Sequence, residues 1–120
     1  MTKIRHILIT LALALSGHAL LAQKAIYAYA IGDWRNGPVV QISPLIETTE
    51  MFTGPQLIKW VRTQWPEQFT ATTDIDVQFF GTLEEGELSR QTLKSKYGVR
   101  KLEVNMLESA EMPRTPERPE

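Results

Sequence analysis

A chain of 120 residues, 42% hydrophobic and 22% charged, is long enough for one domain with a modest core and too short for two. It contains no cysteine, which excludes a disulfide scaffold and a thiol nucleophile. The formal net charge of −1 lacks the basic excess that nucleic-acid binding requires.

Residues 1–22 have the three-part build of a secretory signal peptide: a positively charged start, an apolar run over residues 7–15, and then small residues. That run is too short to span a membrane, which takes about 20 apolar residues. We expect cleavage after Ala22, or alternatively after Ala19. The product would be periplasmic or secreted, with no membrane span after cleavage.

Cleavage would change the chemistry that the chain can perform. Both histidines, His6 and His18, would be lost, so the remaining chain would lack the usual zinc ligands and the usual neutral-pH proton carrier. Eleven basic residues would face 14 acidic ones, a net charge of about −3. We therefore expect no metal, no cofactor and no nucleic-acid partner.

Two β-rich runs open the expected domain, which covers residues 24–107. Tyrosine or isoleucine alternates with alanine in Ala25–Ile31, the period of two that is typical of a strand. A second run, Val39–Ile46, follows a turn that contains Asn36-Gly37, a strong hairpin signal. Pro44 removes a backbone donor from this run, which predicts an edge strand or a bulge.

A helix is expected to open at Thr53-Gly54-Pro55-Gln56, where the hydroxyl and the glutamine have capping-box spacing. Its apolar stripe consists of Leu57, Ile58, Val61 and Trp65, with Trp60 at the margin. Pro66 disfavours helical geometry at the residue before it, so this helix should end at Trp65.

A strand-helix-strand unit then occupies residues 73–107. Both flanking segments alternate, with Ile75, Val77 and Phe79 on one face of the first and Leu102, Val104 and Met106 on one face of the last. Thr82 and Glu85 have capping-box spacing for a helix over 83–97, and Gly98 suits a left-handed residue at its end. A crossover of this length joins parallel strands.

The element order is thus β-β-α-β-α-β. It predicts an α+β fold, a small two-layer sandwich in which a four-stranded mixed sheet carries both helices on one face. Residues 108–120 combine proline with alternating charge and offer little apolar surface to offset their ordering entropy. We expect them to form a disordered tail.

The hairpin turn supplies the first candidate binding residues, Trp34, Arg35 and Asn36. Nothing in the pattern obliges a turn tryptophan to be buried, and tryptophan and arginine are frequent anchors of protein interfaces. This favours a non-enzymatic binding module whose partner is a protein of the bacterial envelope. A sheet edge beside such an anchor could also accept an added strand.

A glycan is the alternative partner. Trp34 would then act as a stacking platform together with Tyr27 and Tyr29, and Arg100 and Lys101 would bind acidic groups. Catalysis has little support, because the chain contains no Ser-x-x-Lys, glycine-rich phosphate loop or Gly-x-Ser-x-Gly motif. We expect no catalytic residue, the remaining alternative being a small hydrolase that uses carboxylates.

One resemblance favours the glycan alternative. Its residues are the run Val77–Thr82 followed by Glu84, Glu85, Leu93, Gly98 and Val104. This pattern resembles the second half of SPOR-type domains, small envelope modules that bind the glycan strands of peptidoglycan, and the resemblance implies that function. SPOR modules run β-α-β-β-α-β, whereas in this chain the hairpin comes first.

Overall fold

A computed structural model describes residues 24–35 and 38–119, in which two helices accompany one mixed five-stranded sheet. The elements are β1 (Ala25–Gly32), β2 (Val39–Ile42), β3 (Ile46–Thr49), α2 (Gly54–Gln64), β4 (Ile75–Phe80), α3 (Leu83–Val99) and β5 (Glu103–Met106). This confirms the α+β class; the extra strand arises because Pro44 divides the second β-rich run. The expected signal peptide and Asn36-Gly37 lie outside the described residues.

Strand β1 is the centre of the sheet. It pairs antiparallel with β2 and β3 along one side and with β4 along the other, and β5 pairs in parallel with β2. Strands β4 and β5 therefore point in the same direction, with β1 and β2 between them. The crossover through α3 joins parallel strands as predicted, although these strands are not neighbours.

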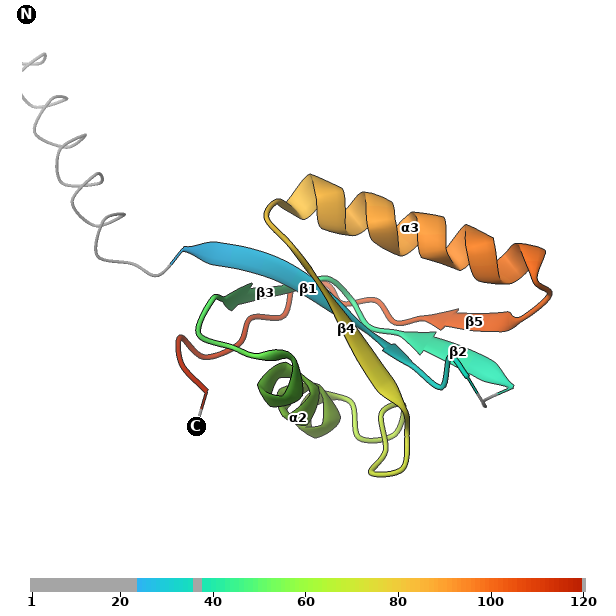
Figure 1. Cartoon of the computed structure of the whole chain (residues 1–120), viewed down its shortest axis with the longest axis horizontal. Helices are drawn as coiled ribbons and strands as arrows, with labels where there is room; N and C mark the ends of the chain where they lie inside the picture. Colours follow the sequence, from blue (N-terminus) through green and yellow to red (C-terminus); the bar gives the residue numbers. More distant parts are fainter. Residues whose placement is uncertain (1–23, 36–37, 120) are drawn as a thin grey trace, which may run out of the picture.

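The two helices lie on opposite faces of the sheet, so the expected placement of both on one face is wrong (Figure 1). The physical reason is that both faces of β1 are apolar and each requires cover. Ala28 and Ala30 belong to the cluster beneath α2, whereas Tyr29 and Ile31 belong to the cluster beneath α3.

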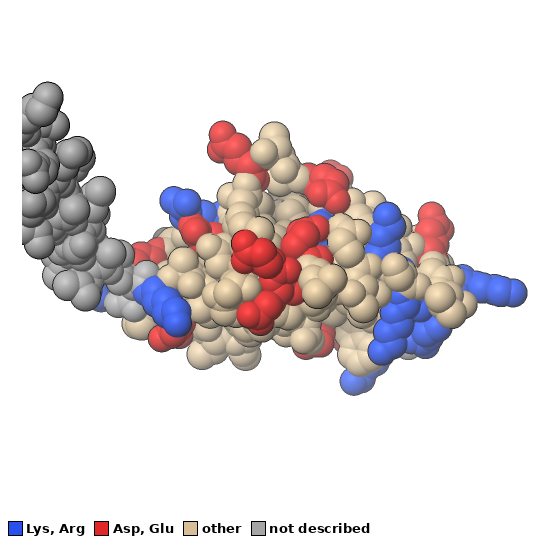
Figure 2. All heavy atoms as spheres, turned by 90° about the horizontal axis from the view of Figure 1, so that it is seen from above, with Lys and Arg blue, Asp and Glu red and all other residues tan. Residues whose placement is uncertain are grey.

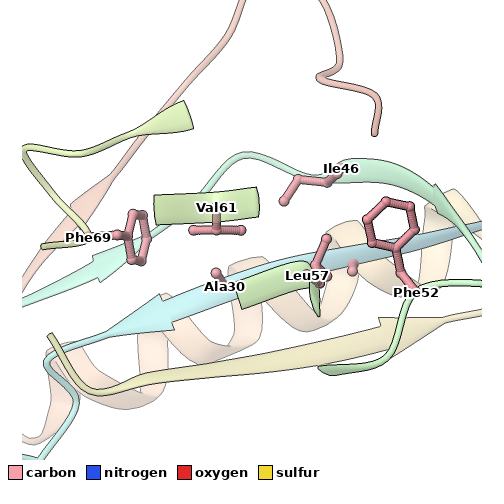
Figure 3. Close-up of a cluster of buried hydrophobic side chains, with 7 residues drawn as sticks. Ala30, Ile46, Phe52, Leu57, Val61 and Phe69 are labelled. Carbon is pink, nitrogen blue, oxygen red and sulfur yellow. The ribbon is translucent and has the colours of Figure 1, made fainter. Parts of the chain in front are cut away.

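The small side chains of β1 let α2 approach closely, as expected from the alanine face. Leu57 and Val61 of α2 are fully buried in one cluster with Ala28 and Ala30 of β1. Figure 3 shows Val61 and Leu57 beside Ala30, with Phe69 at one end of the cluster. The helix begins with the predicted capping box between Thr53 and Gln56 and ends at Trp65.

The other face holds a second core, between β1, β2, β5 and α3. Tyr29 is 1% exposed and its ring stacks on Phe80 with centroids 5.6 Å apart. Tyr97 of α3 and Val104 of β5 complete the cluster. Phe79, expected on a buried face, is 39% exposed.

Helix α3 ends two residues later than predicted, and Gly98 is not its left-handed residue. Lys101 has φ 61° instead. The amide of Leu102 donates to the carbonyl of Tyr97 and the amide of Lys101 to that of Gly98, which is a Schellman ending. Contact of Leu102 and Tyr97 with one apolar cluster holds the helix to this later ending.

Pro44 lies in a bulge. Ile31 pairs with Ile42 and Ala28 with Ile46, so three steps on β1 face four on its neighbour. The Ser43 hydroxyl accepts from the Ala30 amide at 2.8 Å. Before the bulge, β2 is not an edge strand because β5 pairs with its outer side, whereas after it β3 is the last strand in the order β3-β1-β2-β5.

Arg90 of α3 ties the bulge to the chain after β5. The residue is 2% exposed, and its Nε donates to the Ser43 carbonyl at 2.8 Å while Nη2 donates to the Leu107 carbonyl at 2.6 Å. The carboxylates of Glu87 and Glu108 lie at 3.5 Å and 3.3 Å. One helical side chain thus connects α3 to two separate parts of the chain, the bulge and the residues after β5.

The segment expected to be a disordered tail contacts β3 through residues 113–117, whereas residues 108–112 are exposed. Arg114 forms a parallel bridge with Glu47, and Thr115 is 6% exposed. The strand partner of these residues is 67 positions away in the sequence, so composition alone could not predict the contact. We call residues 113–119 the proline segment.

Candidate functional site

The hairpin turn holds the first two predicted binding residues. Trp34 is half-buried and packs against the cluster beneath α3, and the guanidinium carbon of Arg35 lies 4.4 Å from the centroid of its ring. An arginine at this distance over an indole is a cation–π contact. The stack fixes the direction of both side chains. Asn36, the third predicted residue, lies outside the described residues.

Arg100 and Lys101 lie in the turn between α3 and β5. The Arg100 guanidinium stands 5.9 Å from the ring centroid of Tyr97, a second cation–aromatic pair. Lys101 holds the left-handed position of the Schellman ending, which directs the chain back toward the sheet. Both residues are exposed.

These two turns meet at one end of the sheet, which we call the Trp34 end (Trp34, Arg35, Arg100 and Lys101). Val39 pairs with Glu103, so the turn before β2 and the turn before β5 are neighbours. Figure 2 shows basic side chains gathered at this end of the α3 face and acidic ones gathered over its middle. The sequence-predicted residues from two distant turns are thus brought together.

Of the two predicted tyrosines, Tyr29 is not available as a stacking platform. Tyr29 is buried, and its hydroxyl hydrogen-bonds to Ser89 of α3 at 2.9 Å. Burial raises the pKa of Tyr29 above its usual 10.0, an effect that the Ser89 hydrogen bond partly offsets. Tyr27 is half-buried and packs against the same cluster. Both belong to the core beneath α3.

A second site, which the sequence reasoning missed, is formed where the proline segment meets β3. The Glu47 amide donates to the Pro113 carbonyl at 2.9 Å, and the Thr115 amide donates to the Glu47 carbonyl at 3.0 Å. The Thr115 hydroxyl donates to the buried Thr48 hydroxyl at 2.9 Å, and Arg114 pairs with the Glu47 carboxylate. The one signal in the sequence is the spacing of prolines at every third position, 113, 116 and 119.

A cavity of about 310 Å³ adjoins this site. The cavity is lined by the loop after β3, by α2 and by the proline segment. The lining residues are Phe52, Gln56, Lys59, Trp60, Thr63, Pro116 and Pro119. The Trp60 ring is held edge-to-face by Trp65 at 5.9 Å between centroids. The result is an aromatic wall that faces two prolines.

The described part of the chain offers few other chemical groups. Among residues 24–35 and 38–119 there is no group of three or more His, Cys, Asp or Glu side chains that could hold a metal ion. Over the same stretch no helix is both long and apolar enough to cross a membrane.

The described residues form a small α+β domain. Comparisons with protein-family models, with curated proteins and with solved structures found no match. Function is therefore argued from the residues themselves.

Proposed function

We propose that the protein is an exported, non-enzymatic binding module of the bacterial envelope, and that its partner is a protein bound at the Trp34 end. The observation that carries the proposal is the convergence of Trp34, Arg35 and Arg100 from turns 65 positions apart onto one end of the sheet. Tryptophan and arginine supply most interface hot spots. The signal-peptide pattern of residues 1–22 supports export.

The charge at this end favours an acidic segment of the partner. Arg35, Arg100 and Lys101 are exposed cations, and two of them are held over aromatic rings. An arginine oriented in this way loses less side-chain freedom when it binds a carboxylate, because its planar fork is already positioned. A protein partner fits better than a glycan, since burial removes Tyr29 from the stacking platform that a sugar would need.

Export is tested by sequencing the N-terminus of the protein recovered from a bacterial culture. A start at Gln23, or at Leu20, supports export. An intact residue 1–22 segment on a membrane-bound species contradicts it.

Binding is tested with the wild-type chain and three variants: Trp34→Ala, Arg100→Glu and, as a matched charge control at the opposite end of β1, Lys24→Glu. A protein captured from envelope extract would be purified and its affinity measured for each variant. Trp34→Ala and Arg100→Glu should each weaken binding about tenfold or more, which corresponds to 1.4 kcal/mol, while Lys24→Glu should not.

Purified peptidoglycan serves as the second arm of the same test. Cosedimentation of wild type with peptidoglycan, lost in Trp34→Ala, would replace the protein partner with a glycan. Affinity for the captured protein that is equal in wild type and Trp34→Ala would show that the Trp34 end is not the binding surface.

A further inference from the structure

We propose that the β3 edge and the Trp60 cavity form a binding site for an extended, proline-spaced segment of a partner protein, which this chain's own proline segment occupies. The site lies away from the Trp34 end, because β3 pairs with the opposite half of β1. It therefore adds a second surface to the proposed function and does not depend on it.

The backbone register suits a proline-containing ligand. Successive amides of an extended chain point to opposite sides. The Thr115 amide points toward Glu47 of β3, so the nitrogen of Pro116 faces away from the sheet. The proline therefore removes no ladder hydrogen bond, and it blocks the addition of a further strand on the outer side.

The proline spacing suits the cavity. A polyproline II helix has three residues per turn, so residues three apart lie on the same side. Pro116 and Pro119 have this spacing, and both line the cavity opposite Phe52 and Trp60. Aromatic-lined grooves are the usual receptors of proline-rich segments in this conformation.

Two side-chain contacts define the ligand between its prolines. The Thr115 hydroxyl meets Thr48, which is 2% exposed, so an apolar residue at that position would leave a buried hydroxyl without its partner. Arg114 pairs with Glu47, which favours a basic residue. The expected ligand class is an extended Pro-basic-Thr-Pro segment with a further proline three positions on.

The occupying segment is held in a way that permits exchange. Residues 108–112, which connect it to the sheet, are all exposed. The cavity beside Trp60 remains open although both prolines reach it. A tethered segment competes at a high effective concentration, and a partner's apparent affinity falls in proportion to the fraction of free site. A proline segment that is docked nine-tenths of the time would weaken partner binding about tenfold.

The test uses a fluorescent peptide with the sequence of residues 110–119 and the full chain carrying Thr115→Pro. This substitution removes two of the groups that hold the segment in place, the amide and the hydroxyl of Thr115, and leaves the contacts of Pro113, Arg114 and Glu117. Fluorescence anisotropy should show the peptide binding Thr115→Pro about tenfold or more tighter than wild type. Arg118→Ala, at an exposed position of the same segment, should bind the peptide as wild type does.

Specificity is tested within the same assay. Trp60→Ala in the Thr115→Pro chain should abolish binding, and a peptide with valine at the threonine position should not bind. A peptide with alanine at its Glu117 and Arg118 positions should bind normally, because neither side chain contributes to the proposed recognition.

Three outcomes would overturn the proposal. A folded Thr115→Pro chain that binds no peptide would show that the β3 edge recognises nothing. Unfolding of both Thr115→Pro and Arg114→Glu would make the segment a permanent strand of the fold. A wild-type dimer that Thr115→Pro abolishes would assign the site to the segment of a second copy.

Discussion

Replacing Arg90 with alanine should be among the most damaging single changes to this fold. The substitution removes two hydrogen bonds from a buried guanidinium, one to the Ser43 carbonyl and one to the Leu107 carbonyl. A hydrogen bond from a charged donor contributes about 1.5–3 kcal/mol, so the combined loss of two is about 3–6 kcal/mol. This is a large share of the 5–15 kcal/mol typical of a domain.

The carboxylate contacts of Arg90 should matter much less. The Glu108 side chain is 72% exposed, and exposed ion pairs are weakened by solvent and salt. Glu108→Gln should therefore cost less than about 1 kcal/mol. Arg90→Lys should fall between the two, because one ammonium cannot reach both carbonyls with the geometry of a guanidinium.

Urea denaturation followed by tryptophan fluorescence measures these differences. Arg90→Ala should shift the midpoint far below that of wild type, and Glu108→Gln should leave it nearly unchanged. A loss of less than about 1 kcal/mol in Arg90→Ala would refute the reasoning, because the carbonyls would then be satisfied without the guanidinium.

Three further predictions concern the helix and the core beneath it. Gly86→Ala should lower the urea midpoint, because the added Cβ would lie 2.7 Å from Leu45 Cδ1 and overpacking costs about 1–3 kcal/mol. The Cβ added by Gly98→Ala meets nothing within 4 Å, so this change should raise the free energy of unfolding by about 0.5–1 kcal/mol. Equal shifts of the two variants would contradict this reasoning. Phe80→Ala should cost about 2–3 kcal/mol in thermal unfolding through loss of the ring stack, and an unchanged Tm would show that the stack is not stabilising. Because burial raises the pKa of Tyr29, the unfolded chain releases the tyrosine proton at a lower pH than the folded chain does. The contribution of Tyr29 to the free energy of unfolding should therefore be complete below about pH 10 and decline above it, and the decline should be less steep in Tyr29→Phe. Identical alkaline profiles of the two proteins would contradict the assignment.

Local patterns predicted the elements well because the forces that set them are local. Alternation of apolar residues identified the strands, and the hydroxyl of Thr53 identified the start of α2. The alternation of Ala28 and Ala30 with Tyr29 and Ile31 also held the evidence for two cores. Both faces of that strand are apolar, and a fold with both helices on one side of the sheet would cover only one of them.

The errors concern features set by distant partners. Gly98 lost the left-handed position to Lys101 because packing of Leu102 against the core selects where the helix ends. Phe79 faces the same side as Val77 but lies beyond the cover of α2, so alternation assigned its face and not its burial. Sequence reasoning brought Trp34 and Arg100 forward for separate reasons; only the sheet pairing shows that they share an end.

The proline segment failed the composition argument for a related reason. Its own side chains cannot form a core, but β3 offers the free amide and carbonyl of Glu47 and the hydroxyl of Thr48. A prediction of disorder from the composition of the segment alone does not consider these hydrogen-bonding groups of β3. The spacing of the prolines was the one sequence feature that indicated an extended conformation, but it does not indicate which surface the segment contacts.

The bulge at Pro44 has a consequence for how this fold could change over generations. Ile42 faces the core beneath α3, yet Ile46, four residues later, faces the core beneath α2. In an unbulged strand both would face the same way. Loss of a single residue between them would leave three steps on each strand, and a regular strand would then still direct Ile46 to the core beneath α2. What would be lost is the bulge, and with it the Ser43 carbonyl and hydroxyl that Arg90 and the Ala30 amide bind. The extra residue is therefore not needed to cover either core, and descendants of this protein are expected to lose it only together with the buried arginine that it anchors.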